Sequence, residues 1–301
     1  MRIVVALGGN ALSKRGETLT AEGQRASIKV AAKSLAALLE AGHEVVVTHG
    51  NGPQVGYLAL QGGPFPLDVL GAETDGMIGY VLQQELDNAY APDAQYATLL
   101  TQIEVDPNDP AFQKPTKFIG PIYTEEDAAK LSAERGWTIG QDGAHFRRTV
   151  PSPRPKRILE ITVINLLLDR GVIVICAGGG GIPVVQKPDG TMIGVEAVID
   201  KDHASGHLAR ALEADAFLML TDVEGVFDGW GTPGQTLIRQ ATPQEMAQKS
   251  FPPGSMGPKV EAACDFARAT GGFAAIGRLA DCVELVDGTT GTRISETSQD
   301  G

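Results

Sequence analysis

Two lysines occupy positions where a helix is expected to begin, and such positions favour a bound anion. Lys201 lies between Asp200 and Asp202, and Lys259 lies in the first turn of the helix that would follow Ser255. A lysine at a helix N-terminus opposes the helix dipole, which is stabilised there by negative charge. A phosphate bound at this place would remove the conflict. Either lysine alone is also compatible with a solvated surface position, because exposed lysines are common.

Three apolar segments each end in a glycine turn that could offer backbone N–H groups to the same anion. The segments and their turns are Ile3–Leu7 with Gly8-Gly9-Asn10, Val45–Thr48 with His49-Gly50-Asn51-Gly52, and Val172–Ala177 with Gly178 to Gly181. Short apolar runs bounded by glycine are typical of buried parallel strands, and open α/β sheets bind ligands at the carboxyl ends of such strands. A single turn of this kind can be a simple strand–helix connection. Three of them favour phosphate binding.

Phosphoryl transfer is the chemistry that lysines beside glycine turns can support, because it needs positioning and positive charge more than a covalent nucleophile. Asp202 could orient the lysines or help to hold magnesium, although an aspartate at a helix start is often only a cap. The segment from Thr221 to Phe227 could bind a nucleoside, with Phe227 against the base, or could be an ordinary turn with a core aromatic. The chain has neither a GxxxxGK[ST] motif nor an intact GxGxxG motif.

Other classes of function have less support. Lysine and arginine number 25 against 37 acidic residues, a net charge of −12 that disfavours nucleic-acid binding. The longest apolar stretch, residues 172–185, contains four glycines and is shorter than the roughly 20 residues of a membrane span. The three cysteines are scattered, and the histidines lack metal-ligand spacing. We therefore expect a cytoplasmic protein without nucleic-acid or membrane partners.

The elements expected around these residues alternate between strands and helices, which indicates an α/β fold. Further helices are expected at about 28–39, 77–86, 124–135, 159–170 and 200–213, and further strands at 97–105, 216–220 and 273–276, with a hairpin at 184–195. Residues 112–157 are rich in proline and contain one evident helix. They predict a protruding subdomain or lid, because a plain connection of this length would be unusual.

Several long motifs in this order resemble the carbamate kinases, and the resemblance runs nearly end to end. The motifs are Ala6–Leu12, His49–Gly56, Gly178–Val184, Glu196–Asp202 and Gly254–Lys259, together with Pro115-Thr116-Lys117 and Val150-Pro151-Ser152-Pro153. The resemblance implies the amino acid kinase fold, a three-layer α/β/α sandwich around a largely parallel sheet, as a single domain over residues 1–301. It implies an acceptor lobe over residues 1–171, including the subdomain, and a nucleotide lobe over residues 172–301.

The activity implied is reversible phosphoryl transfer between ATP and carbamate, forming ADP and carbamoyl phosphate, by a homodimer that uses Mg²⁺. The usual catabolic direction, in arginine metabolism, is ATP synthesis. The residues implied to bind carbamate and the transferred phosphoryl group are Gly8, Gly9, Asn10, Gly50, Asn51, Gly52, Gly179 and Gly180. Lys201 and Lys259 would stabilise the phosphoryl charge, Asp202 would organise these lysines, and Lys117 would reach the carbamoyl group. The nucleotide would lie among Thr221, Asp222, Val223, Phe227, Met256, Gly257 and Pro258.

Two departures from the family's pattern concern the predicted protruding subdomain and the residue expected to lie against the nucleotide base. Ala144-His145-Phe146-Arg147-Arg148 stands where a Gly-Trp-Arg element is frequent, and Phe227 stands where a tyrosine is frequent. Three other functions stay open: the same fold with a larger acceptor, a non-catalytic nucleotide or carbamoyl phosphate sensor, and a dinucleotide oxidoreductase based on residues 50–56. The lysines disfavour a sensor, and the first two glycine turns carry no arginine for a larger acceptor.

Overall fold

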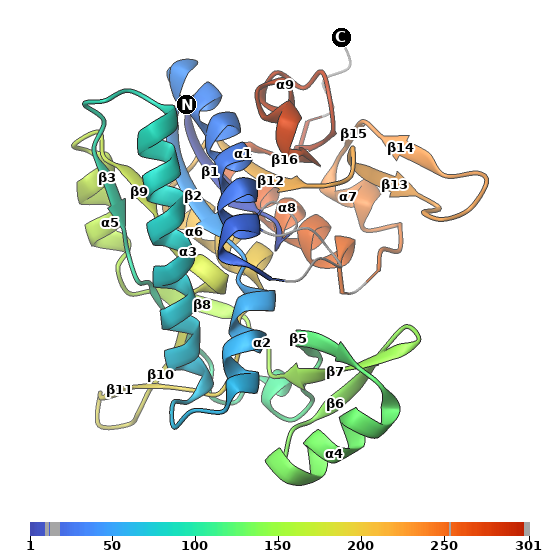
Figure 1. The fold of residues 1–301 in the computed structure, drawn as a ribbon. Coiled ribbons are helices and arrows are strands. Elements are labelled where there is room, and N and C mark those ends of the chain that lie inside the picture. The colour runs from blue at the N-terminus through green and yellow to red at the C-terminus, as the bar shows by residue number, and fades with distance from the viewer. Residues whose placement is uncertain (10–11, 13–18, 253, 298–301) are drawn as a thin grey trace.

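A computed structural model describes residues 1–9, 12, 19–252 and 254–297 of the 301-residue chain. Its centre is an eight-stranded sheet with the order β15-β17-β16-β12-β1-β2-β9-β3 (Figure 1). The strands are β1 (Arg2–Leu7), β2 (Glu44–His49), β3 (Tyr96–Thr98), β9 (Ile173–Ile175), β12 (Ala216–Thr221), β15 (Gln240–Ala241), β16 (Phe273–Arg278) and β17 (Thr292–Ile294). Neighbouring strands are parallel except for β16 and β17.

Helices cover both faces of this sheet, and the alternation along β1 explains the layers. Ile3, Val5 and Leu7 belong to one buried cluster, whereas Val4 and Ala6 belong to another. The first cluster contains side chains of α1 (Ala21–Glu40), α3 (Leu67–Ala89) and α9 (Cys282–Asp287), and the second contains side chains of α5 (Ile161–Leu168), α6 (Lys201–Ala211) and α8 (Met256–Thr270). Because successive strand residues point to opposite faces, the sheet carries a core on each side. The predicted α/β/α sandwich with a largely parallel sheet is confirmed.

The region predicted as one strand at 97–105 forms two strands in different sheets. After β3 the chain turns, and β4 (Gln102–Val105) joins a second sheet of order β11-β10-β4-β8. The turn is fixed by Thr101, whose hydroxyl accepts the N–H of Ala177 at 2.8 Å. The second sheet also contains β8 (Pro155–Ile158) and the predicted hairpin, which is confirmed as β10 (Ile182–Gln186) and β11 (Met192–Gly194).

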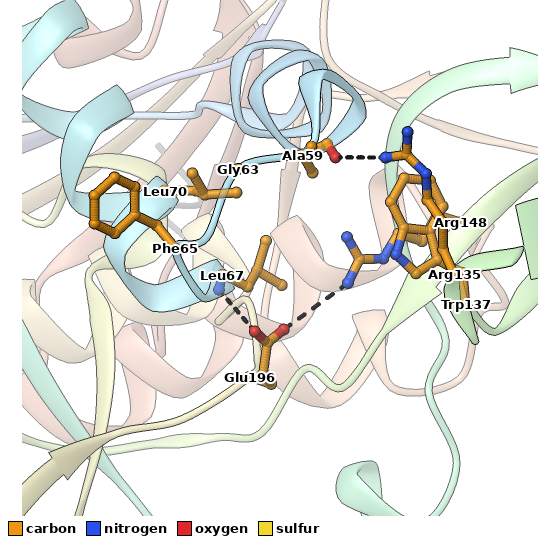
Figure 2. A pocket seen from close by; sticks show the side chains of 10 residues that line it. Ala59, Gly63, Phe65, Leu67, Leu70, Arg135, Trp137, Arg148 and Glu196 are labelled. Carbon is orange, nitrogen blue, oxygen red and sulfur yellow. Dashed lines mark hydrogen bonds and ion pairs between the residues drawn. The ribbon is translucent and has the colours of Figure 1, made fainter.

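Residues 117–150 form a small antiparallel unit that projects away from the main sheet (Figure 1, green). It consists of β5 (Lys117–Tyr123), α4 (Glu125–Arg135), β6 (Ile139–Asp142) and β7 (His145–Val150). We call it the protruding subdomain. It contacts α2 (Gly52–Gln61), where a Cβ atom on Gly56 would lie 1.9 Å from the Cα of Gly120, so only glycine permits this approach. Arg135 adds hydrogen bonds to the carbonyls of Ala59 (Figure 2) and Leu60, both at 3.1 Å.

The remaining short elements connect these parts. They are η2 (Pro110–Phe112), η3 (Gly178–Gly180), β13 (Val226–Asp228), β14 (Thr236–Ile238), α7 (Pro243–Met246) and η4 (Leu279–Asp281). In the described part of the chain, no helix combines the length and the apolar character that crossing a membrane requires.

Candidate active site

The predicted glycine turns after β1 and β2 meet at the carboxyl edge of the main sheet. The N–H of Gly8 donates to the carbonyl of Leu220 in β12 at 2.9 Å. A Cβ atom on Gly50 would lie 3.8 Å from both the backbone nitrogen of Gly9 and the Cδ of Lys201. Two turns and one lysine that are distant in sequence are therefore neighbours in space. Asn10, predicted from the same motif, lies outside the described residues.

The third glycine turn packs under this group and fixes its position. Gly179 and Gly180 have positive φ values of 69° and 98°, and both are buried. A Cβ atom on Gly179 would lie 2.2 Å from the Nδ2 of Asn51, and one on Gly180 would lie 2.2 Å from the carbonyl oxygen of Ile199. The turn thus holds Asn51 on one side and the residues preceding Lys201 on the other. Its predicted contacts with substrate stay a prediction.

Lys201 and Lys259 converge on the carboxylate of Asp202. Lys201 Nζ lies 2.9 Å from Oδ1, and Lys259 Nζ donates a 2.7 Å hydrogen bond to Oδ2. The sequence predicted both lysines at helix starts, and the structure places them in the first turns of α6 and α8. Lys201 is only 9% exposed and Asp202 only 4%. An ammonium has three N–H donors and the ion pair with Asp202 uses at most one of them, so Lys201 can still donate to a ligand.

The protonation of this cluster follows from burial and from the opposing charges. Burial would raise the pKa of Asp202, but the two lysine ammonium groups outweigh it and hold the pKa well below its ordinary value. Burial lowers the pKa of Lys201, and the neighbouring Lys259 acts in the same direction. Burial acts to lower the pKa of Lys259 as well, but Asp202 and its hydrogen bond prevail and raise it. The cluster therefore concentrates positive charge beside the glycine turns.

Lys117 reaches this cluster from the protruding subdomain. It is the first residue of β5, and its ammonium donates to the Oδ2 of Asp200. The other carboxylate oxygen of Asp200 caps α6 by accepting the N–H of Asp202 at 2.9 Å. Burial would raise the pKa of Asp200, but the charge and hydrogen bond of Lys117, together with the charge of His203, outweigh it and lower the pKa. Asp200 therefore joins the subdomain to the helix that carries Lys201.

Two helix N-termini at the site lack a side-chain cap. Asn51 precedes α2 and Ser255 precedes α8, but neither side chain accepts a hydrogen bond from its helix. The Asn51 amide instead donates to the Thr74 hydroxyl at 2.8 Å. Free N–H groups in the first turn of a helix attract anions. The predicted residues Gly52 and Gly257 lie in these two turns, and the N–H of Gly257 already donates to the carbonyl of Pro252 at 2.9 Å.

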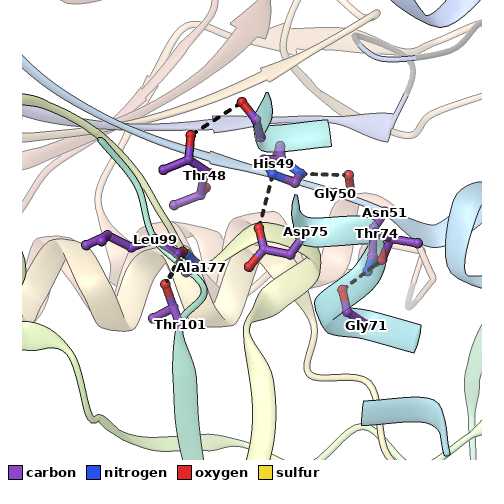
Figure 3. A network of polar contacts seen from close by, with 12 residues as sticks. Thr48, His49, Gly50, Asn51, Gly71, Thr74, Asp75, Leu99, Thr101 and Ala177 are labelled. Atoms are coloured by element: carbon purple, nitrogen blue, oxygen red, sulfur yellow. Dashed lines mark hydrogen bonds and ion pairs between the residues drawn. The ribbon is translucent and has the colours of Figure 1, made fainter. Parts of the chain in front are cut away.

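A buried pair that the sequence did not predict supports the turn after β2. His49 and Asp75 are fully buried, and Nε2 of His49 lies 3.4 Å from Oδ1 of Asp75 (Figure 3). A Cβ atom on Gly178 would lie 1.8 Å from the same carboxylate oxygen, so the pair lies against the third glycine turn. One signal in the sequence could have indicated that Asp75 is buried. It lies three residues before Ile78, a spacing that places both side chains on the same, buried face of α3.

Some of the predicted nucleotide residues lie near Lys259. Thr221 ends β12, and its hydroxyl donates to Asp222 at 3.0 Å. Asp222 also acts electrostatically on Lys259, which places the loop after β12 near the cluster. Phe227 packs on Trp230 with ring centroids 5.3 Å apart, and Trp230 is 56% exposed. Sequence reasoning overlooked Trp230. The other predicted members, which are half-buried, are Val223, Met256, Gly257 and Pro258.

Comparisons with known proteins agree with this geometry. The family model described as the amino acid kinase family matches residues 1–273. Carbamate kinase from Rhizobium meliloti (strain 1021) is 56% identical and covers 100% of this chain and 95% of that protein. Carbamate kinase from Haemophilus influenzae is 54% identical, over 99% of this chain and 98% of that protein. The solved structure of carbamate kinase from Giardia lamblia bound to AMP-PNP has a TM-score of 0.89 and 40% identity, over 98% of each chain. The chain therefore belongs to the amino acid kinase family and, within it, to the carbamate kinases.

Proposed function

We propose that this protein catalyses reversible phosphoryl transfer between carbamoyl phosphate and ADP, which yields carbamate and ATP. The observation that carries the proposal is the contact of Lys201 and Lys259 with one buried carboxylate, beside two glycine turns. Such a group can hold a phosphoryl group between two substrates and neutralise its charge. The carbamate kinases that match the chain support the identity of the acceptor.

The reaction is a direct in-line transfer in which the enzyme forms no covalent bond. An oxygen of the ADP β-phosphate attacks the phosphorus of carbamoyl phosphate, the new P–O bond forms, and the bond to the carbamoyl oxygen breaks. Carbamate leaves with the bonding electron pair. The Lys201 ammonium, which keeps N–H donors beyond its ion pair with Asp202, donates to the phosphoryl oxygens as their charge is redistributed. The N–H groups of Gly8 and Gly50 already donate to the carbonyls of Leu220 and Leu7, so the other backbone N–H groups of these two turns fix the phosphoryl group.

We assign the two lobes different ligands. Residues 1–171, with the protruding subdomain, bind the carbamoyl group, and residues 172–301 bind the nucleotide. The position of Lys117 on Asp200 supports the first assignment, because it places a subdomain cation beside the helix that carries Lys201. The aromatic pair of Phe227 and Trp230 supports the second, since an exposed aromatic surface can stack on a base. The relative from Giardia lamblia binds the ATP analogue AMP-PNP.

Magnesium enters this site with the nucleotide in our proposal. The carboxylates of Asp200 and Asp202 already accept lysine ammonium groups, so they do not offer a set of unpaired oxygens. In the described residues, no group of three or more histidine, cysteine or acidic side chains is arranged around a common metal position. Magnesium in kinases commonly takes substrate phosphates as its main ligands, with one or two carboxylates. Its chemistry here is to shield the charge of the nucleotide phosphates.

The biological setting that we propose is ATP synthesis in arginine catabolism, by a homodimer in the cytoplasm. The resemblance to the carbamate kinases is the support for this setting. Purified protein at several concentrations, analysed by sedimentation velocity, should give twice the mass of the 31.6 kDa chain.

The assay that tests the proposed reaction measures ATP from carbamoyl phosphate, ADP and Mg²⁺ by a coupled enzyme reaction. We expect saturable ATP formation that disappears when any one of the three is omitted. Acetyl phosphate at the same concentration is the matched control for a non-specific phosphoryl donor and should be used much less efficiently. A folded protein that binds ADP but forms no ATP would exclude the reaction and favour another acceptor or a sensor.

Replacing Lys117 with alanine should weaken the acceptor side of the site more than the nucleotide side. A hydrogen bond to a charged group contributes about 1.5–3 kcal/mol, which corresponds to a KM for carbamoyl phosphate raised about tenfold to a hundredfold. The KM for ADP should change by less than about threefold. Lys130→Ala, an exposed change in α4 of the same subdomain, is the control. Equal increases in both KM values would contradict the acceptor-side placement.

A further inference from the structure

A cavity of about 340 Å³ lies between the protruding subdomain and the far end of α2 (Figure 2). Gly62 and Gly63, which follow α2, contribute to its wall, whereas the glycine turn of the active site lies at the opposite end of the helix. At about 1.5 Å per residue, the ten residues of α2 separate the two places by about 15 Å. The cavity is therefore distinct from the active site, and its volume is at the lower end of the range for small-molecule sites, roughly 300–1,000 Å³.

One wall of the cavity carries two arginines on a single aromatic ring. The guanidinium carbon of Arg148 lies 4.4 Å from the ring centroid of Trp137, and that of Arg135 lies 5.0 Å from it. Arg135 also donates to backbone carbonyls of α2, so its position is fixed. Two guanidinium groups on one ring repel each other, and this arrangement is favourable when an anion lies between or beside them.

Arg148 lacks a hydrogen-bond acceptor within the described part of the chain. Its side chain is 15% exposed, and the nearest carboxylate oxygen, Oε2 of Glu196, is 3.8 Å away. That distance is too long for a hydrogen bond. Glu196 is held elsewhere, because its Oε1 accepts the N–H of Leu67 at the start of α3 at 2.9 Å. Burial lowers the pKa of Arg148 against the opposing effect of Glu196, so the guanidinium is poorly solvated.

The opposite wall is apolar. It consists of Ala59, Leu67 and Leu70, with Phe65 at 57% exposure. Two arginines and one glutamate leave one positive charge, which a single carboxylate would neutralise. We propose that this cavity binds a small monocarboxylate with an apolar body, its carboxylate on Arg148 and Arg135 and its apolar part against Phe65 and Leu70. The proposal is independent of the reaction assigned to the active site.

An occupant of this cavity would strengthen the attachment of the protruding subdomain. Arg148 lies in β7, where it pairs with Ile119 of β5, whereas the apolar wall belongs to α2, α3 and the connection between them, which carries Phe65. A ligand that contacts both walls adds contacts between the subdomain and the rest of the protein. Amide hydrogen exchange in β5 should therefore slow when the cavity is filled.

Benzoate is the probe for this site, and benzamide is its neutral analogue of the same shape. Isothermal titration calorimetry should detect saturable benzoate binding to the wild type, and binding about tenfold weaker or more to Arg148→Gln. Benzamide should bind about tenfold more weakly than benzoate. Lys130→Gln, which removes one exposed positive charge from the same subdomain, should bind benzoate like the wild type, and so should Lys201→Met, which alters only the active site.

Further outcomes decide between this site and its alternatives. Glu196→Gln removes the competing carboxylate and should bind benzoate several-fold more tightly, a gain that misfolding cannot produce. No saturable binding to the wild type, or equal binding to Arg148→Gln, would overturn the site. Loss of binding in Lys201→Met would place the probe in the active site instead. Inorganic phosphate that binds as tightly as benzoate and depends on Arg148 would overturn the requirement for an apolar body. Unchanged exchange in β5 at saturating benzoate would overturn the link to the subdomain.

Discussion

Replacing Lys201 with methionine is expected to lower kcat about a thousandfold and to leave the protein at least as stable as the wild type. Removing one preorganised group that stabilises transition-state charge typically costs about 10²–10³ in kcat. The Lys201 ammonium is buried beside the glycine turns and keeps N–H donors beyond its ion pair with Asp202, so it can still bind the phosphoryl group. Because burial lowers its pKa, the folded protein bears a cost for keeping it charged, and a methionine of similar volume removes that cost.

Lys259→Met should also lower kcat by about 10²–10³ but should destabilise the fold. Its ammonium donates to Asp202, and its pKa is raised, so the folded state gains from its charge. The measurements are kcat from ATP formation and the free energy of unfolding from urea denaturation at pH 7. Lys187→Met, an exposed change in the β10–β11 hairpin, is the control for the loss of one charge. Wild-type turnover in Lys201→Met would contradict the assigned role, and a combined loss of turnover and stability would indicate a structural lysine.

The fold could be predicted largely from local sequence, because its parallel strands are apolar runs that end in glycine. The start of α6 was equally visible, since Asp200 is an N-cap residue by type and caps the helix in the structure. Two differences arose where local patterns are weak. The helix predicted at 77–86 extends over Leu67–Ala89, where glycines and acidic residues interrupt the apolar period at its start. The strand predicted at 97–105 is divided at Thr101 by a hydrogen bond to Ala177, a contact with a residue distant in sequence.

The candidate site shows the same division between local and long-range information. Each lysine was identifiable from its own helix start, but their common contact with Asp202 requires α6 and α8 to pack side by side, 57 residues apart in sequence. The contact between Asn51 and Gly179 and the His49–Asp75 pair likewise depend on how α3 and the third glycine turn approach β2. Residue type and spacing therefore indicate which groups take part, whereas the tertiary fold decides which of them touch.

Asp202→Asn is expected to reduce the free energy of unfolding by about 3–5 kcal/mol at pH 7, because it leaves two buried ammonium groups without their carboxylate. The pKa of Asp202 is depressed in the folded state, so its stabilising effect is present above its ordinary pKa and is lost only as the pH falls through the folded value. At alkaline pH the stability of the variant depends instead on the protonation of Lys201. Burial already lowers the pKa of Lys201 in the folded state. In the folded variant, Lys201 therefore loses its proton at a lower pH than it does in the unfolded chain. Stability rises with pH wherever the unfolded state binds more protons, so the deficit should shrink between about pH 8 and pH 10.

Urea unfolding of the wild type and of Asp202→Asn, at one protein concentration and at pH 7, 8.5 and 10, measures this deficit as the difference between their free energies of unfolding. Effects of pH that are common to both proteins cancel in that difference. Asp93→Asn, an exposed carboxylate before β3, should show no deficit at any of these pH values. Since Asp202 also holds Lys259, kcat should fall with stability at pH 7, yet the recovery of stability at pH 10 should not restore turnover. A deprotonated Lys201 no longer repels Lys259, but it also no longer neutralises the charge of the phosphoryl group. A deficit that stays constant from pH 7 to pH 10 would mean that Asp202 stabilises the fold by hydrogen bonding alone, independently of the charge on Lys201.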